Sequence, residues 1–267
     1  MKIVTGFFMA WGNFSAMPCP CKLWDEKARK HMLVAFPFVG LLMGIIWYLL
    51  FLAVSFFRLP LPVEAVVMTA FPFIVSGAIH LDGFMDCNDA ILSRRDLKER
   101  QRILKDPHVG SFAVIAILML FMFSFAFMWA ILGEKSPEKM LFLIFIPVLS
   151  RALTAREVLK NKPMATSQYQ PTVEEGQTKP YILAAIIIWI VAALVAIFTL
   201  GYLVYINCYG YSLVGILHIL IVVLAQFFAL ILACLYGRKS LGGMNGDIAG
   251  FSLVWSELIA LAALAVI

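Results

Sequence analysis

Charged residues are scarce in this chain. Asp, Glu, Lys and Arg together make up 14% of its 267 residues, and hydrophobic residues make up 63%. A soluble globular domain carries about 25% charged residues, so the composition excludes that class. The apolar residues form continuous runs long enough to cross a bilayer, which excludes the short alternating segments of a transmembrane β-barrel. The sequence therefore predicts an all-α, polytopic integral membrane helical bundle.

Other features are also absent. The five cysteines are scattered, and the pair Cys19 and Cys21 has no further Cys or His nearby. This pattern favours unpaired thiols over a metal or redox site. No internal repeat is evident, which weighs against the inverted-repeat architecture of many secondary transporters. The first residues lack a clear small-residue cleavage site, so we expect them to be retained.

Hydropathy predicts about seven transmembrane helices within a single membrane-embedded domain, residues 1–267. Residues 1–30 are expected to form an interfacial or re-entrant segment, 81–108 a cytoplasmic catalytic helix and loop, and 156–180 a mobile cytoplasmic loop. The expected spans are 32–57, 61–80, 109–132, 139–155, 181–204, 211–236 and 247–267.

The positive charges alternate between connections. Lys and Arg number five in the N-terminal segment, six in 81–108, five in 151–180 and two in 237–246, against one, two and none in the other connections. The positive-inside rule therefore predicts a multi-pass protein of the cell (inner or cytoplasmic) membrane. Its N-terminus and its polar chemistry are expected in the cytoplasm, and its C-terminus outside.

The stretch "HLDGFMDCND" at residues 80–89 places three carboxylates at the edge of an apolar run. On a helix, Asp82, Asp86 and Asp89 lie at i, i+4 and i+7, within about 60° of one another. Gly83 is expected to leave room beside Asp82 for a ligand, and His80 precedes Asp82 by two residues. Hard oxygen ligands at this spacing suit Mg²⁺, with Mn²⁺ as the alternative. The simpler interpretation is a solvated acidic helix start.

Further candidates lie on the same side of the membrane. Lys105 and Asp106, beside His108, are expected to face the same pocket. Arg151 and Arg156 either bind phosphate or anchor the fourth span at the interface. In "GGMNGDIAGFSLVWSE", Gly246 frees the backbone and Asp247 opens an apolar helix. Glu257 lies within that helix, and a carboxylate inside a span suggests function.

These motifs resemble the cobalamin synthase family, also called adenosylcobinamide-GDP ribazoletransferases. The resemblance covers most of the chain and includes "MPCP", "FPFVGLLMG", "HLDGFMDCNDA", "ILKDPHVGSF", "SRAL" and "GGMNGDIAGFSLVWSE". Two positions depart from the family pattern, which usually has Thr at position 245 and Gly at position 90, where this chain has Asn245 and Ala90. These departures concern nucleotide fit rather than the reaction.

The resemblance implies a Mg²⁺-dependent membrane enzyme. A hydroxyl of α-ribazole, or of its 5′-phosphate, would attack the phosphoryl group on the cobinamide side of adenosylcobinamide-GDP, and GMP would leave. By similarity, Asp82, Asp86 and Asp89 would hold the metal against the diphosphate. His80, Asp89 and Asp247 are the candidate bases, and Lys105, Arg151 and Arg156 could stabilise the leaving group.

The expected partners are the two small-molecule substrates and the lipid bilayer, with no nucleic acid. A homo-oligomer, or a complex with other cobalamin-pathway enzymes, stays open. Two alternatives for the function also stay open. One is another Asp-rich membrane phosphotransferase or prenyltransferase, and the other is a divalent-cation transporter. A transporter predicts carboxylates spread through the bilayer depth, whereas these cluster at one end.

Overall fold

The computed structural model describes residues 2–134, 136–174, 176–207 and 212–267, and within these ranges the chain forms helices and no strand. The all-α prediction is therefore confirmed. The elements are α1 (Lys2–Phe14), the 3₁₀ helix η1 (Glu26–Ala28), α2 (Arg29–Phe56), α3 (Leu61–Val75), α4 (Ile79–Leu92), α5 (Leu97–Ile103), α6 (Ser111–Gly133), α7 (Pro137–Leu141), the 3₁₀ helix η2 (Phe142–Ile144), α8 (Phe145–Lys160), α9 (Gln170–Glu174), α10 (Lys179–Asn207), α11 (Ser212–Leu241) and α12 (Gly246–Val266).

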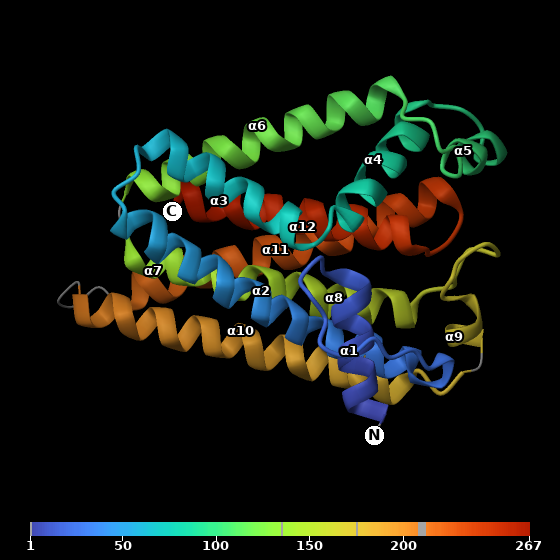
Figure 1. The fold of residues 1–267 in the computed structure, drawn as a ribbon, viewed down its shortest axis with the longest axis horizontal. Coiled ribbons are helices and arrows are strands. Elements are labelled where there is room, and N and C mark those ends of the chain that lie inside the picture. The colour runs from blue at the N-terminus through green and yellow to red at the C-terminus, as the bar shows by residue number, and fades with distance from the viewer. Residues whose placement is uncertain (1, 135, 175, 208–211) are drawn as a thin grey trace.

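The long helices run side by side along one axis, and α1 lies across them (Figure 1). In the described part of the chain, five helices are long and apolar enough to cross a membrane, or six if the bent pair α3 and α4 counts as one span. The expected number of seven is not confirmed. The difference lies at residues 139–155, where a 3₁₀ turn separates α7 from α8 and the continuous apolar length is lost.

The expected span 61–80 ends early, at a sharp bend. Helices α3 and α4 meet at 90°, and Gly77 and Ala78 at the junction have positive φ values of 65° and 58°. The backbone N–H of Ala16 donates to the carbonyl of Val75 across 2.8 Å, which fastens the segment after α1 to this bend. The bend directs α4 away from the axis of α3, toward the end of the bundle where α5 lies (Figure 1).

Helix α8 is the buried centre of the bundle. It contacts α2, α10, α11 and α12, and most of its residues are buried. Gly40 and Gly44 of α2 lie directly against the start of α8 and the end of η2, where their Cβ atoms would overlap the carbonyls of Pro147 and Ile144, respectively. Small residues four apart allow this close helix approach in membranes.

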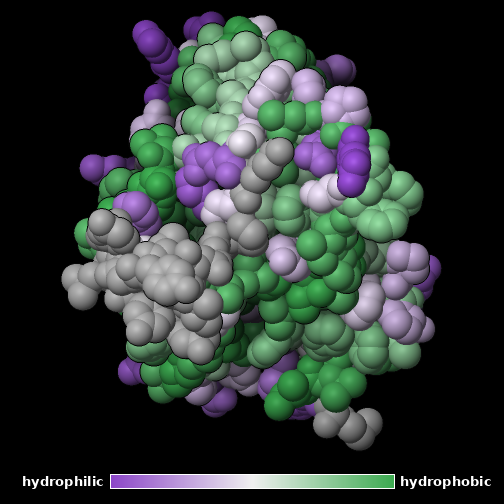
Figure 2. Space-filling view, turned by 90° about the vertical axis from the view of Figure 1, so that its left-hand side faces the viewer, coloured by the Kyte–Doolittle hydropathy of each residue, from purple (hydrophilic) through white to green (hydrophobic). Residues whose placement is uncertain are grey.

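Hydrophobic residues dominate one end of the bundle (Figure 2). Figure 2 looks onto the end opposite the acidic face of α4, and hydrophobic residues cover most of the surface that is not grey, with separate hydrophilic patches between them. Two clusters of buried apolar side chains form the core. One surrounds α4 and the start of α12, and the other fills the opposite half around Trp47 and Phe142.

Candidate functional site

The acidic face of α4 lies beside the first turn of α12. Asp82 is exposed, and Asp86 and Asp89 are half-buried. Asp86 lies within electrostatic reach of Asp82, Asp89 and Asp247, so the structure adds a fourth carboxylate to the expected three. None of the side chains of Asp82, Asp86 and Asp89 has a hydrogen-bond or ion-pair partner among the residues that the structure describes.

The space for a ligand that is expected beside Gly83 is not formed. A Cβ at this position would lie 2.7 Å from the Cα of Asp247 and 2.8 Å from its carbonyl oxygen. About one turn further along α12, a Cβ on Gly250 would lie 2.9 Å from the carbonyl oxygen of His80. The two glycines therefore let α4 and α12 touch backbone to backbone, which brings Asp82 and Asp247 together.

Asn245 fixes the start of α12. Its side-chain oxygen accepts the backbone N–H of Ile248 at 2.9 Å, a typical N-cap. Its amide nitrogen donates to Oδ2 of Asp247 at 2.6 Å. The N-cap residue thus also holds the carboxylate of Asp247 in one orientation.

A cavity of about 210 Å³ opens beside these carboxylates. His80, Asp82, Asp247 and Gly246 line it, together with Thr154 of α8 and the loop residues Gln168 and Tyr169. Apolar side chains of α1 and α2, among them Phe14 and Phe36, form the opposite wall. Nε2 of His80 and Oγ1 of Thr154 are buried and have no hydrogen-bond partner in the described chain. Both residues line the cavity, while these two atoms themselves expose almost no surface.

The loop after α8 closes one side of this cavity. The backbone N–H of Met164 donates to the carbonyl of Met244, and the N–H of Met244 donates to the carbonyl of Lys162, both at 2.9 Å. Arg29 holds the same loop from α2 by donating to the carbonyl of Gln168 at 2.6 Å. Burial raises the pKa of Tyr169 to about 12, so its hydroxyl stays protonated at neutral pH. The mobility expected for residues 156–180 stays a prediction.

No three His, Cys, Asp or Glu side chains of the described residues are close enough to form a complete metal site. A Mg²⁺ site does not require one, because this ion is usually held by one or two carboxylates, water and substrate phosphates. The carboxylates of Asp82, Asp86 and Asp247 are hard oxygen ligands without a neighbouring cation. Their chemistry fits Mg²⁺, and their mutual repulsion gives a physical reason to bind it.

Asp89, Lys105 and Asp106 lie apart from the cavity. The Asp89 carboxylate packs against Gly110, at the N-terminus of α6, where a Cβ would overlap it. Asp106 accepts the backbone N–H of His108 at 3.0 Å and contacts its Nδ1 at 2.7 Å. The backbone hydrogen bond holds the pKa of Asp106 below its usual value. Lys105 is exposed and does not line the cavity, so the expected common pocket is not formed.

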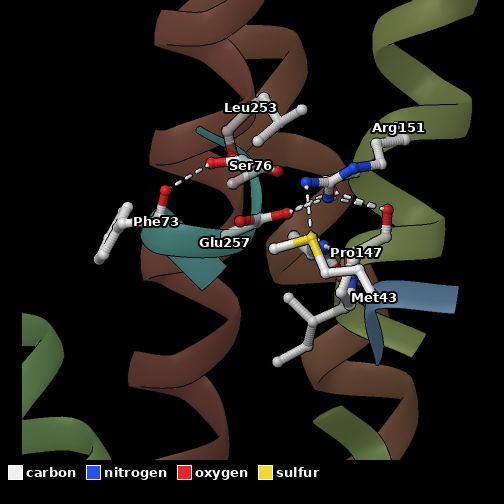
Figure 3. Close-up of polar contacts among 11 residues, drawn as sticks. Met43, Phe73, Ser76, Pro147, Arg151, Leu253 and Glu257 are labelled. Atoms are coloured by element: carbon white, nitrogen blue, oxygen red, sulfur yellow. Dashed lines mark hydrogen bonds and ion pairs between the residues drawn. The ribbon is translucent and has the colours of Figure 1, made fainter. Parts of the chain in front are cut away.

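Arg151 and Glu257 bind each other instead of a phosphate. Nη1 of Arg151 lies 2.7 Å from Oε1 of Glu257, which also accepts from Ser150 at 2.7 Å. Figure 3 shows Glu257 pointing at the guanidinium, which also reaches the carbonyl of Pro147 and the sulfur of Met43. Arg151 is 1% exposed. The pair therefore joins α8 to α12, and substrate contact by either residue stays a prediction.

Arg156 forms an ion pair with the neighbouring Glu157. Glu157 is buried and also accepts from the side chain of Asn161 at 2.7 Å, and Asn161 in turn accepts from Arg238 of α11. Arg156 does not line the cavity. This network fixes the end of α8 where the loop toward Tyr169 begins, so its contribution to the site is structural.

Sequence reasoning missed Thr154, Gln168 and Tyr169. Thr154 lies one turn after Arg151 on the same helix and belongs to the motif "SRALTARE". The sequence analysis considered only the two arginines of that motif as candidate site residues. Gln168 and Tyr169 lie in a loop whose hydrogen bonds to distant segments carry no local sequence signal.

Comparison with known proteins supports one family. A family model described as cobalamin-5-phosphate synthase matches residues 6–265. A protein of Clostridium perfringens (strain 13 / Type A), named adenosylcobinamide-GDP ribazoletransferase, is 36% identical over 259 residues, which are 97% of this chain and 96% of the relative. A protein of the same name from Clostridium botulinum (strain Alaska E43 / Type E3) is 33% identical over 97% of this chain and 96% of the relative. Another, from Halalkalibacterium halodurans, is 27% identical over 96% of this chain and 93% of the relative.

The comparison with solved structures finds no match. The family match nevertheless spans nearly the whole chain and includes α4, the loop at Tyr169 and the start of α12, which together surround the cavity. From the extent of that match and the identity to its relatives, the chain belongs to the cobalamin-5-phosphate synthase family.

Proposed function

We propose that the protein is a Mg²⁺-dependent transferase that joins adenosylcobinamide-GDP to α-ribazole, or to its 5′-phosphate, and releases GMP. The names of the relatives give the reaction. The observation that carries it to this chain is the cavity that Asp82 and Asp247 share with the unpaired His80 and Thr154, beside a cluster of carboxylates. Phosphoryl transfer needs this combination of positioning and charge neutralisation.

The metal would be held by Asp82 and Asp86, which share one face of α4, together with water and the substrate phosphates. When bound, Mg²⁺ neutralises charge on the diphosphate and on the departing GMP. Asp89, the third expected ligand, lies at the outer end of the same face against Gly110. We propose that Asp89 adds to the negative electrostatic potential around the metal and does not itself bind the ion.

Asp247 is the residue best placed to accept the proton of the attacking hydroxyl. It lines the cavity, and Asn245 holds its Oδ2 so that the other oxygen is free. The hydroxyl oxygen forms a bond to phosphorus, the bond to the GMP oxygen breaks, and the proton moves to the Asp247 carboxylate. His80 lies deeper, beside the packed rings of Phe14 and Phe36, and acts by hydrogen bonding to the acceptor.

The test is release of GMP from adenosylcobinamide-GDP by the purified protein, with α-ribazole and Mg²⁺ both required. Asp247→Asn should reduce turnover by at least about a hundredfold, the usual range for loss of a general base. The same protein without α-ribazole is the control for simple hydrolysis. Turnover of Asp247→Asn above a tenth of wild type contradicts the assignment of the base.

The distribution of Lys and Arg supports a cytoplasmic site in the cell membrane. Single cysteines introduced at exposed positions test this orientation in intact cells. Lys98→Cys, in α5, should resist a membrane-impermeant maleimide, and Arg58→Cys, in the connection between α2 and α3, should react with it. The reverse labelling pattern contradicts the orientation.

A further inference from the structure

An apolar groove of about 610 Å³ lies between α4, α11 and α12. Three alanines of α11, spaced four residues apart, line one side, and three larger residues of α12 with the same spacing line the other: Ala225, Ala229 and Ala233, and Phe251, Trp255 and Ile259. Residues four apart share one face of a helix, so the groove runs lengthwise along these two neighbouring helices.

Helix α4 borders the groove with the side that carries no carboxylate. It contributes Asn88, Ile91 and Leu92, and Ile91 lies about 180° around the helix from Asp82. The amide nitrogen of Asn88 donates to the carbonyl of Phe84 at 2.7 Å, so it is already engaged within α4. The groove is therefore separate from the acidic face, and the proposed reaction does not use it.

The length of the groove matches one leaflet of a bilayer. It belongs to a helix that is long and apolar enough to cross a membrane, and Leu232 beside it is 61% exposed. From Ala225 to Tyr236 the groove extends about 16 Å along α11, whereas the hydrocarbon core of a bilayer is about 30 Å thick. A transmembrane helix of another protein needs the full thickness, but an acyl chain of a lipid occupies one leaflet.

Basic residues surround one end of this groove. Lys239 follows Tyr236 by three residues, which places it on the same face of α11, one turn beyond the groove. Arg94 and Arg95 come within three residues of Leu92, where α4 ends. All three cations are exposed. The apolar groove therefore ends in a cluster of positive charge.

The carboxylates nearest to these cations are engaged elsewhere. Gln101 of α5 donates to the carbonyl of Leu241 at 2.8 Å, which holds α5 beside the end of α11. Within α5, the side chain of Asp96 caps the helix, and Glu99 forms an ion pair with Arg102 at 2.7 Å. Positive charge therefore remains in excess at the end of the groove.

We propose that this groove binds one acyl chain of an anionic phospholipid, whose headgroup phosphate lies at Arg94, Arg95 and Lys239. Tyr236 lies at the depth where tyrosine is favoured, between the acyl chains and the headgroups. A zwitterionic headgroup carries its own cation and gains less from the basic cluster. In the orientation proposed above, the basic end faces the cytoplasmic leaflet, where anionic lipids are found.

Tryptophan fluorescence measures this binding, because Trp255 lines the groove and bromine quenches a tryptophan that it contacts. Purified full-length protein in detergent micelles is titrated with phosphatidylglycerol that carries brominated acyl chains. Trp24 and Trp129 are also exposed, so the signal of a Trp255→Phe variant is subtracted. The difference should saturate, and brominated phosphatidylcholine should bind at least about fivefold more weakly, the effect of one basic residue near a membrane surface.

Two variants test the two parts of the site. Lys239→Gln should weaken the binding of brominated phosphatidylglycerol about fivefold and leave that of phosphatidylcholine unchanged. Lys239→Arg retains the charge and should bind as the wild type does. Ala229→Phe fills the groove and should abolish the saturable quenching by both lipids. The midpoint of thermal unfolding shows whether Ala229→Phe is folded, and Lys239→Gln decides the outcome if it is not.

The matched controls lie outside the groove. Lys27→Gln removes an exposed lysine of η1, which contacts α1 and α2. Ala184→Phe enlarges a partly exposed alanine of α10 that does not line the groove. Both variants should give the titration curve of the wild type with each of the two lipids.

Four results overturn the proposal: quenching of Trp255 that does not saturate, equal affinity for the two lipids, wild-type affinity in Lys239→Gln, or wild-type affinity in folded Ala229→Phe. A protein that is dimeric in detergent and becomes monomeric as lipid binds would also overturn it, because a second copy would then occupy the groove. Light scattering detects that change. None of these measurements involves a substrate, so their outcome is independent of the proposed function.

Discussion

Gly83 and Asp247 lie in direct backbone contact, although 164 positions apart in sequence, and a Cβ on residue 83 would lie 2.7 Å from the Cα of Asp247. This contact sets the distance between the two helices that carry the acidic side chains. Because the two backbones touch here, the first turn of α12 cannot move closer to α4.

Gly83→Ala should therefore separate α4 from α12. We expect a loss of about 1–3 kcal/mol in the free energy of unfolding, as for other overpacked sites, and at least a tenfold loss of GMP release. Thermal unfolding and turnover measure the two effects. Gly12→Ala is the control, since its Cβ would meet nothing closer than 3.9 Å. Full activity of Gly83→Ala would show that the helix contact is not required.

Mg²⁺ should stabilise the wild-type protein before any substrate is added. Binding at one hundred times the dissociation constant contributes about 2.7 kcal/mol, which a rise in the midpoint of thermal unfolding reports. Asp86→Asn removes one of the repelling charges, so it should unfold no earlier than wild type without Mg²⁺ and respond weakly when the ion is added.

The control for this measurement is Asp96→Asn, because Asp96 caps α5 and Asn caps a helix equally well. It should show the full response to Mg²⁺. An Asp86→Asn variant that is stabilised as strongly as Asp96→Asn would contradict the metal assignment.

The Arg151–Glu257 pair should matter for stability and not for phosphate binding. Arg151→Ala leaves Glu257 partly buried without its cation, at a cost of about 3–5 kcal/mol. The double variant Arg151→Met, Glu257→Leu removes both charges and should recover most of that loss. If the recovered double variant has wild-type KM values, neither residue binds substrate. A large rise in its KM for the donor would restore the phosphate-binding hypothesis.

Stability should fall at high pH through Tyr169. Its folded-state pKa is raised to about 12 by burial, while tyrosine in an unfolded chain ionises near pH 10. The stabilising contribution is therefore complete below pH 10 and is lost as the pH rises from about 10 to 12, by on the order of 2–3 kcal/mol. Tyr169→Phe should show a shallower decline in thermal stability across this window.

Tyr236→Phe serves as the reference for that comparison, because Tyr236 is 54% exposed. Its stability should decline with pH as the wild type does. Equal slopes for Tyr169→Phe and Tyr236→Phe would show that Tyr169 ionises alike in the folded and unfolded chain.

Local sequence patterns predicted the parts of the structure that depend on local physics. The all-α class follows from the apolar runs, and the shared face of Asp82, Asp86 and Asp89 follows from helical spacing. The predicted continuous span at 61–80 is not formed, because the chain bends at Gly77 and Ala78. This bend depends on tertiary contacts such as the hydrogen bond from Ala16 to Val75. A hydropathy window averages across such a bend and cannot detect it.

The same limit applies to the candidate site. The sequence leaves Arg151 open between phosphate binding and an interfacial anchor and suggests a functional role for Glu257, and only the fold shows that the two residues pair with each other. The cavity residue Tyr169 is distant in sequence from α4, and nothing in its neighbours indicates that the loop after α8 passes beside that helix.

The close contact of α2 with α8 at Gly40 and Gly44 has a consequence for biosynthesis. A charged side chain at the centre of a lipid-exposed helix costs roughly 2.5–3.5 kcal/mol, so α8 gains little from entering lipid alone. Its Arg151 pairs with a residue made 106 positions later. We therefore expect α8 to pack against α2 during synthesis until α12 is made, so that membrane insertion of α8 is part of folding rather than a step before it.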